Sequence, residues 1–270
     1  MIPVLLGGLA AKNLSDILTA DKYEAQARNV NYEAFSMIEA ASRKLRSQYE
    51  KLESTMTKLA NRKRGIMSGT LPKFIAVHEK IIQINFDKRL SIDTVKSLAM
   101  RPENLSNMNQ MISVSGVQMT DKEIIGTFLF SWEYGGIGGA IKKDAKIKLD
   151  IAYTRSDEAE VIAYNTDNAR IALEGIDDKA KAVLKLLTQM NALLLKSIQY
   201  TNEIIERNGF EVNYYSDADI DAIQNCCNFA VAVSDVLKAP LFDSNGKISN
   251  QIDATLSTGN EYIKKMQAVH

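Results

Sequence analysis

The stretch FSMIEAASRKLRSQYEKLESTMTKLANRKRGI, residues 35–66, decides the fold. Its apolar residues recur alternately three and four positions apart, and charged residues occupy the opposite face of the helix that this spacing predicts. Only Ser42 and Lys63 place a polar group at one of the apolar positions. Such a narrow stripe is typical of a coiled coil rather than of the broader buried face of a globular helix. The predicted coiled-coil seam consists of Phe35, Ile38, Leu45, Tyr49, Leu52, Met56, Leu59 and Ile66.

This helix is too long for a compact globule. Its 32 residues span about 48 Å at the α-helical rise, and the chain of 270 residues has a mass of only 30.0 kDa. We therefore expect long helices packed lengthwise, with a coiled-coil arm over residues 13–67. After the arm, the sequence predicts a helix that follows Pro72 and runs to about Phe86. Short helices and turns are expected over 91–112, with a break at Pro102.

The C-terminal part of the chain, residues 145–268, has the pattern of further helices. A wide apolar stripe predicts a helix over 177–208, and Gly209 supplies its C-terminal stop. Another helix begins after Ser216, whose hydroxyl is suited to cap its first turn. The sequence thus predicts an all-α fold: an elongated antiparallel helical bundle with long coiled-coil helices, forming a single domain over residues 1–270.

An apolar segment, residues 124–141, lies between these helical parts. It holds five glycines and a single charged residue, Glu133. Gly135 and Gly139 have the spacing that lets helices approach closely. The residues that give the apolar segment its character are Ile124, Ile125, Phe128, Leu129, Phe130, Trp132, Gly135, Gly136, Gly138 and Gly139.

Two patterns compete just after the apolar segment. The spacing of alanines over 145–173 favours one face of a helix, whereas apolar–polar alternation over 147–153 favours a strand. We favour the helix, and a short β-hairpin near 124–153 is the alternative.

Composition excludes several classes of function. The chain has 33 Lys and Arg against 33 Asp and Glu, so it lacks the basic excess of a general nucleic-acid binder. Two adjacent cysteines, Cys226 and Cys227, cannot form a disulfide framework, which fits a reducing compartment. We expect at least one of them to lie in the core. His78 stands among apolar residues on a helix, so we expect a packed or boundary side chain rather than a catalytic one.

No constellation of residues points to catalysis. The glycines of the apolar segment precede Lys142 and Lys143, but Asp144 follows where a phosphate-binding loop requires Ser or Thr. The turn at 243–247 lacks the carboxylates of a calcium loop. We therefore predict no catalytic residue, no cofactor and no metal site. The basic run 61–65 is interpreted as a solvated helix end, with contact to phosphate or anionic lipid as the alternative.

The sequence resembles bacterial helical proteins that carry a glycine-rich hydrophobic segment between two coiled-coil arms. The resemblance rests on the start MIPVLLGG, on Gly135-Gly-Ile-Gly-Gly139, and on Leu237-Lys-Ala-Pro-Leu-Phe-Asp-Ser-Asn-Gly-Lys247. The layout of those proteins is similar to that of apolipoprotein L and of cytolysin A-type helical pore formers. It implies a pore-forming or membrane-remodelling component, and it implies no catalytic residue.

The apolar segment therefore has two interpretations. It is either a buried hairpin whose glycines permit tight packing, or a membrane-seeking hairpin that is sheltered until activation. Permanent insertion is disfavoured, because a carboxylate such as Glu133 costs about 2.5–3.5 kcal/mol at the centre of a bilayer.

The leading expectation is a non-enzymatic protein that acts at a lipid bilayer or on a membrane-bound partner, and that assembles with itself or with another chain. It is expected in the cytoplasm or peripherally on a membrane. The alternative is a cytosolic coiled-coil scaffold or adaptor, whose seam over 35–66 binds a second chain.

Overall fold

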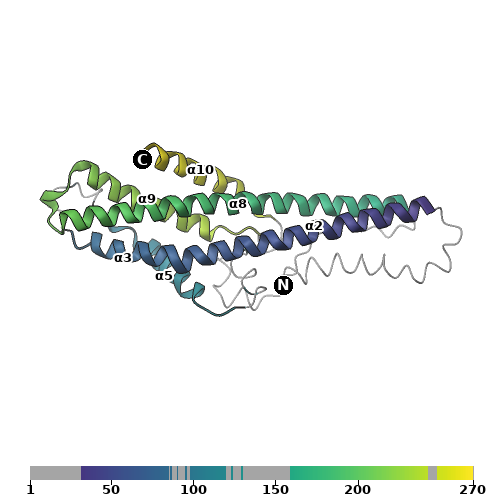
Figure 1. Cartoon of the computed structure of the whole chain (residues 1–270), viewed down its shortest axis with the longest axis horizontal. Helices are drawn as coiled ribbons and strands as arrows, with labels where there is room; N and C mark the ends of the chain where they lie inside the picture. The colour runs from purple at the N-terminus through teal and green to yellow at the C-terminus, as the bar shows by residue number, and fades with distance from the viewer. Residues whose placement is uncertain are drawn as a thin grey trace. The chain divides into compact units, whose positions relative to one another are not determined.

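The computed structural model describes residues 32–84, 98–119, 159–242 and 248–269 and the single positions 86, 90, 95, 123 and 129, with side chains omitted for 32–38, 159–163 and 268–269. These residues are almost entirely helical (Figure 1), which confirms the all-α class. The elongated coiled-coil bundle stays a prediction, and the β-hairpin near 124–153 falls outside the described residues apart from Leu129. The elements are α2 (Tyr32–Gly65), the π-helical turn η3 (Ile66–Thr70), α3 (Leu71–Ile81), α5 (Pro102–Ser115), α8 (Ala159–Asn208), the 3₁₀ turn η5 (Val212–Tyr214), α9 (Asp217–Lys238) and α10 (Gln251–Val269).

The chain divides into two compact units, each with its own buried apolar side chains. Unit 1 comprises Met1–Ala60, Met119–Ala182 and Pro240–Ser249. Unit 2 comprises Asn61–Gln118, Val183–Ala239 and Asn250–His270.

In unit 2, α9 contacts α3, α5 and α10. Apolar residues recur along α9 every three or four residues, so they lie on one face of the helix, and this face is buried. The buried residues of α9 include Ile220, Ile223, Cys226, Cys227, Phe229, Ala230, Val233, Val236 and Leu237.

Helices α2 and α3 are joined without a break by the π-helical turn η3. The sequence correctly predicts a helix around Pro72, but the structure starts it at Leu71 and ends it at Ile81, short of Phe86. Proline lacks an amide hydrogen and its ring clashes with the carbonyl four residues earlier, so the regular ladder cannot continue through it. The widened turn relieves this conflict, and the amide of Leu71 donates to the carbonyl of Ile66 instead.

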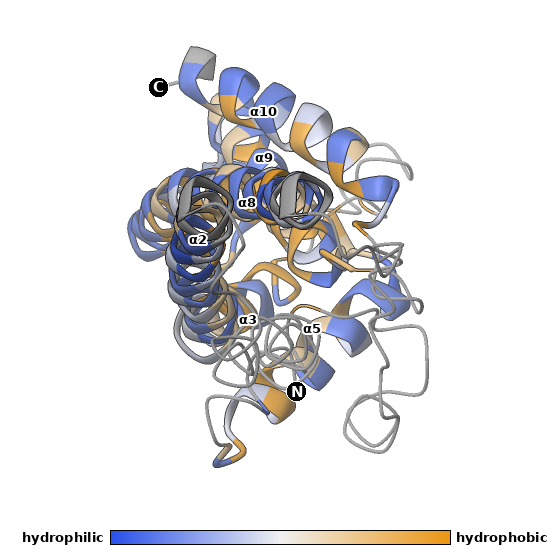
Figure 2. Cartoon of the chain, turned by 90° about the vertical axis from the view of Figure 1, so that its right-hand side faces the viewer, coloured by the Kyte–Doolittle hydropathy of each residue, from blue (hydrophilic) through white to orange (hydrophobic). Residues whose placement is uncertain are grey.

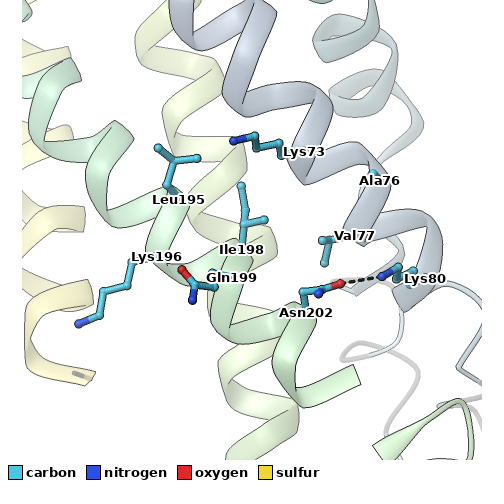
Figure 3. Close-up of a pocket in the computed structure, with 9 residues that line it drawn as sticks. All are labelled: Lys73, Ala76, Val77, Lys80, Leu195, Lys196, Ile198, Gln199 and Asn202. Carbon is cyan, nitrogen blue, oxygen red and sulfur yellow. Dashed lines mark hydrogen bonds between the residues drawn. The ribbon is translucent and has the colours of Figure 1, made fainter. Parts of the chain in front are cut away.

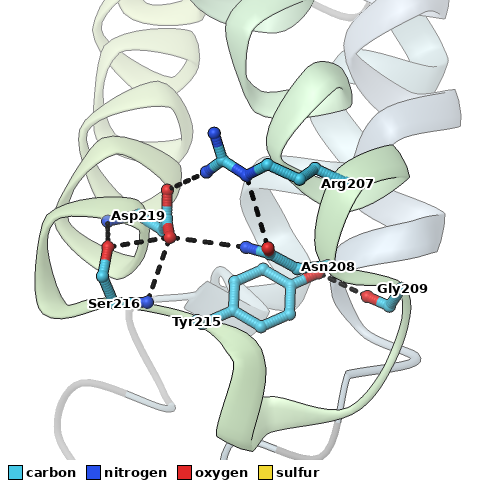
Figure 4. Close-up of polar contacts among 6 residues, drawn as sticks. All are labelled: Arg207, Asn208, Gly209, Tyr215, Ser216 and Asp219. Carbon is cyan, nitrogen blue, oxygen red and sulfur yellow. Dashed lines mark hydrogen bonds and ion pairs between the residues drawn. The ribbon is translucent and has the colours of Figure 1, made fainter.

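The turn between α8 and α9 is held by a carboxylate, as Figure 4 shows. Gly209 ends α8 with a φ of 65°, as predicted, and its carbonyl accepts a 2.6 Å hydrogen bond from the Tyr215 hydroxyl. Asp219 then accepts hydrogen bonds from the amide and hydroxyl of Ser216, at 3.0 and 2.7 Å. Its other oxygen lies 2.6 Å from Nη2 of Arg207. In return, the amide of Asp219 donates to the hydroxyl oxygen of Ser216 at 3.1 Å, which completes the reciprocal capping box that starts α9.

Replacing Asp219 with alanine is expected to lower the free energy of unfolding by about 1–3 kcal/mol, because it removes half of the capping box and the ion pair. Burial would raise the pKa of Asp219, but hydrogen bonds from Ser216 and the charge of Arg207 hold that pKa below its usual value. Its stabilising effect is therefore present above the ordinary carboxyl pKa and fades as the pH falls through the lowered pKa. Urea unfolding, followed by circular dichroism, should show a large difference in the free energy of unfolding between wild type and Asp219→Ala at pH 7 and a smaller one at pH 3. Asp221→Ala is the exposed control.

A glycine lets α10 approach α8 within unit 2. A β-carbon placed on Gly259 would lie 2.6 Å from Cδ2 of Leu186, closer than atoms pack. Hydrophobic and hydrophilic residues alternate along α10 with the turns of the helix (Figure 2), and the side chains of Ile252, Ile263 and Met266 are buried. Contact with the rest of unit 2 thus explains why this C-terminal helix forms at all.

Unit 1 contains the first part of α2 and of α8. Apolar residues from both stretches are buried there, and so are several polar ones, among them Gln48, Thr55 and Asp177. The buried face of α2 is therefore wider and more polar than the narrow apolar seam that the sequence predicts. The carboxylate of Asp177 is 1% exposed and its Oδ2 lies 2.7 Å from Nζ of Lys181. Burial would raise the pKa of Asp177, but Lys181 and the hydroxyl of Thr55 hold it below the usual value.

Candidate functional site

The apolar segment is described at one residue only, Leu129. That side chain is fully buried, with 0% exposure, and its carbonyl accepts hydrogen bonds from two successive amides of unit 1. The amide of Leu241 lies 3.0 Å away and that of Phe242 lies 3.2 Å away. The remaining predicted residues lie outside the described part of the chain: Ile124, Ile125, Phe128, Phe130, Trp132, Gly135, Gly136, Gly138 and Gly139.

The residues that hold Leu129 are themselves fixed. Leu241 and Phe242 are 1% and 2% exposed. Phe242 forms an isolated antiparallel β-bridge with Ile248, and the amide of Ser249 donates to the carbonyl of Leu241 at 3.0 Å. Leu129 therefore docks on a short, internally bonded stretch that follows α9 in the chain.

Most of the predicted coiled-coil seam is buried within the chain. Leu45, Leu52, Met56, Leu59 and Ile66 are each at most 3% exposed, and Tyr49 is half-buried. Phe35 and Ile38 lie in α2, with side chains outside the description. The sequence pattern thus identifies the buried face of α2 correctly from residue 45 onward.

The basic run at the end of α2 departs from the prediction. The solvated helix end is wrong for Lys63, which is 1% exposed. Its ammonium donates to the carbonyls of Leu237 and Ala239, at 3.0 and 2.8 Å, at the C-terminus of α9. Within the described residues no carboxylate pairs with it, and burial lowers the pKa of Lys63 to about 7.

Arg64 binds the C-terminal end of α5 in the same way. Its Nε donates to the carbonyl of Ser115 at 3.0 Å and its Nη2 to that of Val117 at 2.7 Å, just where α5 ends. A cation satisfies the free carbonyls of a helix C-terminus and is favoured by the helix dipole. Lys63 and Arg64 therefore cap two other helices of unit 2, which is a structural role.

The cysteines and the histidine are packed, as predicted. Cys226 and Cys227 are both buried, and burial raises the pKa of each thiol, which leaves them unreactive. His78 is 3% exposed, its Nε2 lies 3.0 Å from the carbonyl of Leu98, and burial lowers its pKa. The same carbonyl accepts a weak contact from the thiol of Cys227.

A basic groove runs between α3 and α8 in unit 2, and the sequence analysis missed it. At one end the hydroxyl of Thr70, the last residue of η3 before α3, donates to Asn191 of α8 at 2.6 Å, and at the other end Lys80 of α3 donates to Asn202 of α8 at 2.7 Å. Between these two bonds lies an open space of about 590 Å³. Its lining residues are Lys73, Ala76, Val77, Lys80, Leu195, Lys196, Ile198, Gln199 and Asn202. Lysines spaced seven apart on one helix are the only local pattern that could have indicated it.

The described part of the chain holds neither a bilayer-spanning helix nor a cluster of metal ligands. None of its helices has a stretch both long and apolar enough to cross a lipid bilayer. Its histidine, cysteine, aspartate and glutamate side chains form no group of three or more that could hold a metal ion. In comparisons with known proteins, no protein-family profile, curated protein or solved structure matches this chain.

Proposed function

We propose that this protein acts without catalysis at a membrane, or on a membrane-bound partner, through the apolar segment 124–141. The segment is sheltered in the resting state and released on activation. The observation that carries the proposal is Leu129, which is fully buried and held through its carbonyl by the amides of Leu241 and Phe242.

The energetics of this contact suit a reversible shelter. Burying a leucine side chain contributes about 1.5–3 kcal/mol, and each backbone hydrogen bond adds about 0.5–1.5 kcal/mol net. The free energy that holds Leu129 in place is therefore small enough to be replaced when the segment is buried in a lipid or protein surface. Release requires a ligand that binds the exposed segment better than the sheltered one, which a bilayer does by burying the same apolar side chains.

The alternative is a cytosolic scaffold that binds a second chain through the coiled-coil seam. Its seam would have to be accessible, but Leu45, Leu52 and Met56 are buried within the chain itself. A second chain would therefore need to displace existing contacts along α2. The burial of the seam favours the membrane proposal over this form of scaffold.

Vesicle flotation and dye release with the full chain test the proposal. The wild type is expected to float with vesicles and release dye. Gly135→Leu plus Gly138→Leu is expected to reduce dye release, because a leucine side chain would prevent the close approach that glycines permit between helices. Gly65→Leu plus Gly175→Leu is the matched control, since both of these glycines lie in helices with open space around them. A wild type that ignores vesicles at every pH and salt concentration would overturn the proposal.

A further inference from the structure

The groove between α3 and α8 combines one kind of charge with an apolar floor. Three of its lining residues are lysines and none is acidic. Val77 and Ile198 form the buried part of the floor, and Ala76 and Leu195 lie toward its opening. The lining combines three lysines and two side-chain amides with four apolar side chains, and its volume of about 590 Å³ lies in the usual size range of a small-molecule site.

Two polar side chains that line the groove are held in place by hydrogen bonds to residues that do not line it. Asn202 donates its amide to Glu206 at 2.6 Å, which leaves its oxygen to accept from Lys80. Gln199 donates to Glu203 at 2.9 Å in the same manner. Lys80 is thus held in place at one end of the groove by a chain of hydrogen bonds along α8.

Lys73 is available for a ligand. Figure 3 shows it extending from α3 toward α8, above Leu195 and Ile198. Neither Lys73 nor Lys196 makes a hydrogen bond or an ion pair with the described residues. Lys73 and Lys80 are seven residues apart on one helix, which separates them by about 10 Å along its axis.

We propose that this groove binds an organic phosphate whose body is apolar. Lys73 holds the phosphate, and Lys196 adds positive charge from the edge of the groove, where its side chain extends away from α3 (Figure 3). The body lies on Val77 and Ile198, and a polar end meets Lys80 and Asn202. A phosphate suits these lysines because the ammonium group is a compact point charge, and the three acceptor oxygens of a phosphate can meet it from several directions.

This inference stands apart from the proposed function. The groove belongs to unit 2, whereas Leu129 and the residues that hold it belong to unit 1. A protein that ignores vesicles could still bind a soluble phosphate here, and the two failures are therefore distinguishable.

Fluorescence titration of the full chain with 1-naphthyl phosphate tests the site. We expect saturable binding that Lys73→Gln plus Lys196→Gln weakens at least tenfold. Ala76→Phe should weaken it as strongly without a change of charge, because the ring fills the opening of the groove. Lys185→Gln plus Lys264→Gln removes the same charge from exposed positions of unit 2 outside the groove and should leave the affinity unchanged.

The source of the phosphate is distinguished in a second arm. Vesicles containing phosphatidic acid, with phosphatidylcholine vesicles as the control, are compared with soluble 1-naphthyl phosphate. Binding of the soluble ligand alone assigns a soluble organic phosphate, and groove-dependent binding of the phosphatidic acid vesicles assigns a lipid headgroup. The inference would be overturned if neither probe bound saturably. It would also be overturned if Lys73→Gln plus Lys196→Gln and Lys185→Gln plus Lys264→Gln lost the same amount of affinity.

Discussion

Lys63→Glu is expected to lower the free energy of unfolding by about 3–5 kcal/mol, the cost of leaving a buried charge without a partner. The change places a buried carboxylate against the carbonyl oxygens of Leu237 and Ala239, which now face a negative charge and lose their donor. The charge cannot reach water, because the side chain at position 63 is 1% exposed.

Lys63→Met removes the positive charge but keeps an unbranched side chain that can pack in the same place. The methionine loses both hydrogen bonds but needs no desolvation, so we expect a free energy of unfolding within about 2 kcal/mol of the wild type at pH 7. The pKa of Lys63 is about 7 in the folded protein and 10.5 in its ordinary state. Between these values the unfolded chain binds more protons, so the stability of the wild type rises with pH by up to about 1.4 kcal/mol per unit. This rise should be absent from Lys63→Met.

Urea unfolding between pH 7 and 9.5, followed by circular dichroism, measures both effects. The difference between wild type and Lys63→Met isolates this one group, because all other titrating groups are shared. Arg62→Glu is the control for charge reversal, since Arg62 is the exposed neighbour. An equal loss in Arg62→Glu and Lys63→Glu would show that Lys63 is not held as the structure describes.

Lys63 also shows how far the sequence alone can be taken. The heptad spacing places it on the buried face of α2, and this part of the prediction is correct. Its local composition, between Arg62 and Arg64, instead suggests a solvated helix end. The groups that make burial tolerable, the carbonyls of Leu237 and Ala239, lie more than 170 residues away and carry no mark in the sequence.

Local rules succeeded where the cause is local. Gly209 ends α8 through its backbone conformation and Ser216 starts α9 through its side chain, so both were predictable. The π-helical turn before Pro72 depends on how two helices join, and the groove depends on lysines from α3 and α8 that only folding brings together. Features of this second kind require the tertiary structure.

Leu129→Ala is the substitution that tests the shelter itself. Truncating a fully buried leucine costs about 2–5 kcal/mol, and here the loss falls on the contact that holds the apolar segment. A loss of 2 kcal/mol raises the exposed population about thirtyfold. We therefore expect more of the variant to float with vesicles, together with faster hydrogen exchange at the amides of Leu241 and Phe242, which lose the stable position of their acceptor.

Leu173→Ala is the matched control, because Leu173 is 4% exposed and belongs to the α8 part of unit 1. It removes the same atoms from the core of the same unit and changes none of the residues that form the hydrogen-bonded contact, Leu129, Leu241 and Phe242. If destabilisation alone drove vesicle association, both variants would float equally and the proposed shelter would be refuted. If the shelter is the cause, only Leu129→Ala floats more strongly, and only its amides at 241 and 242 exchange faster, at equal loss of stability.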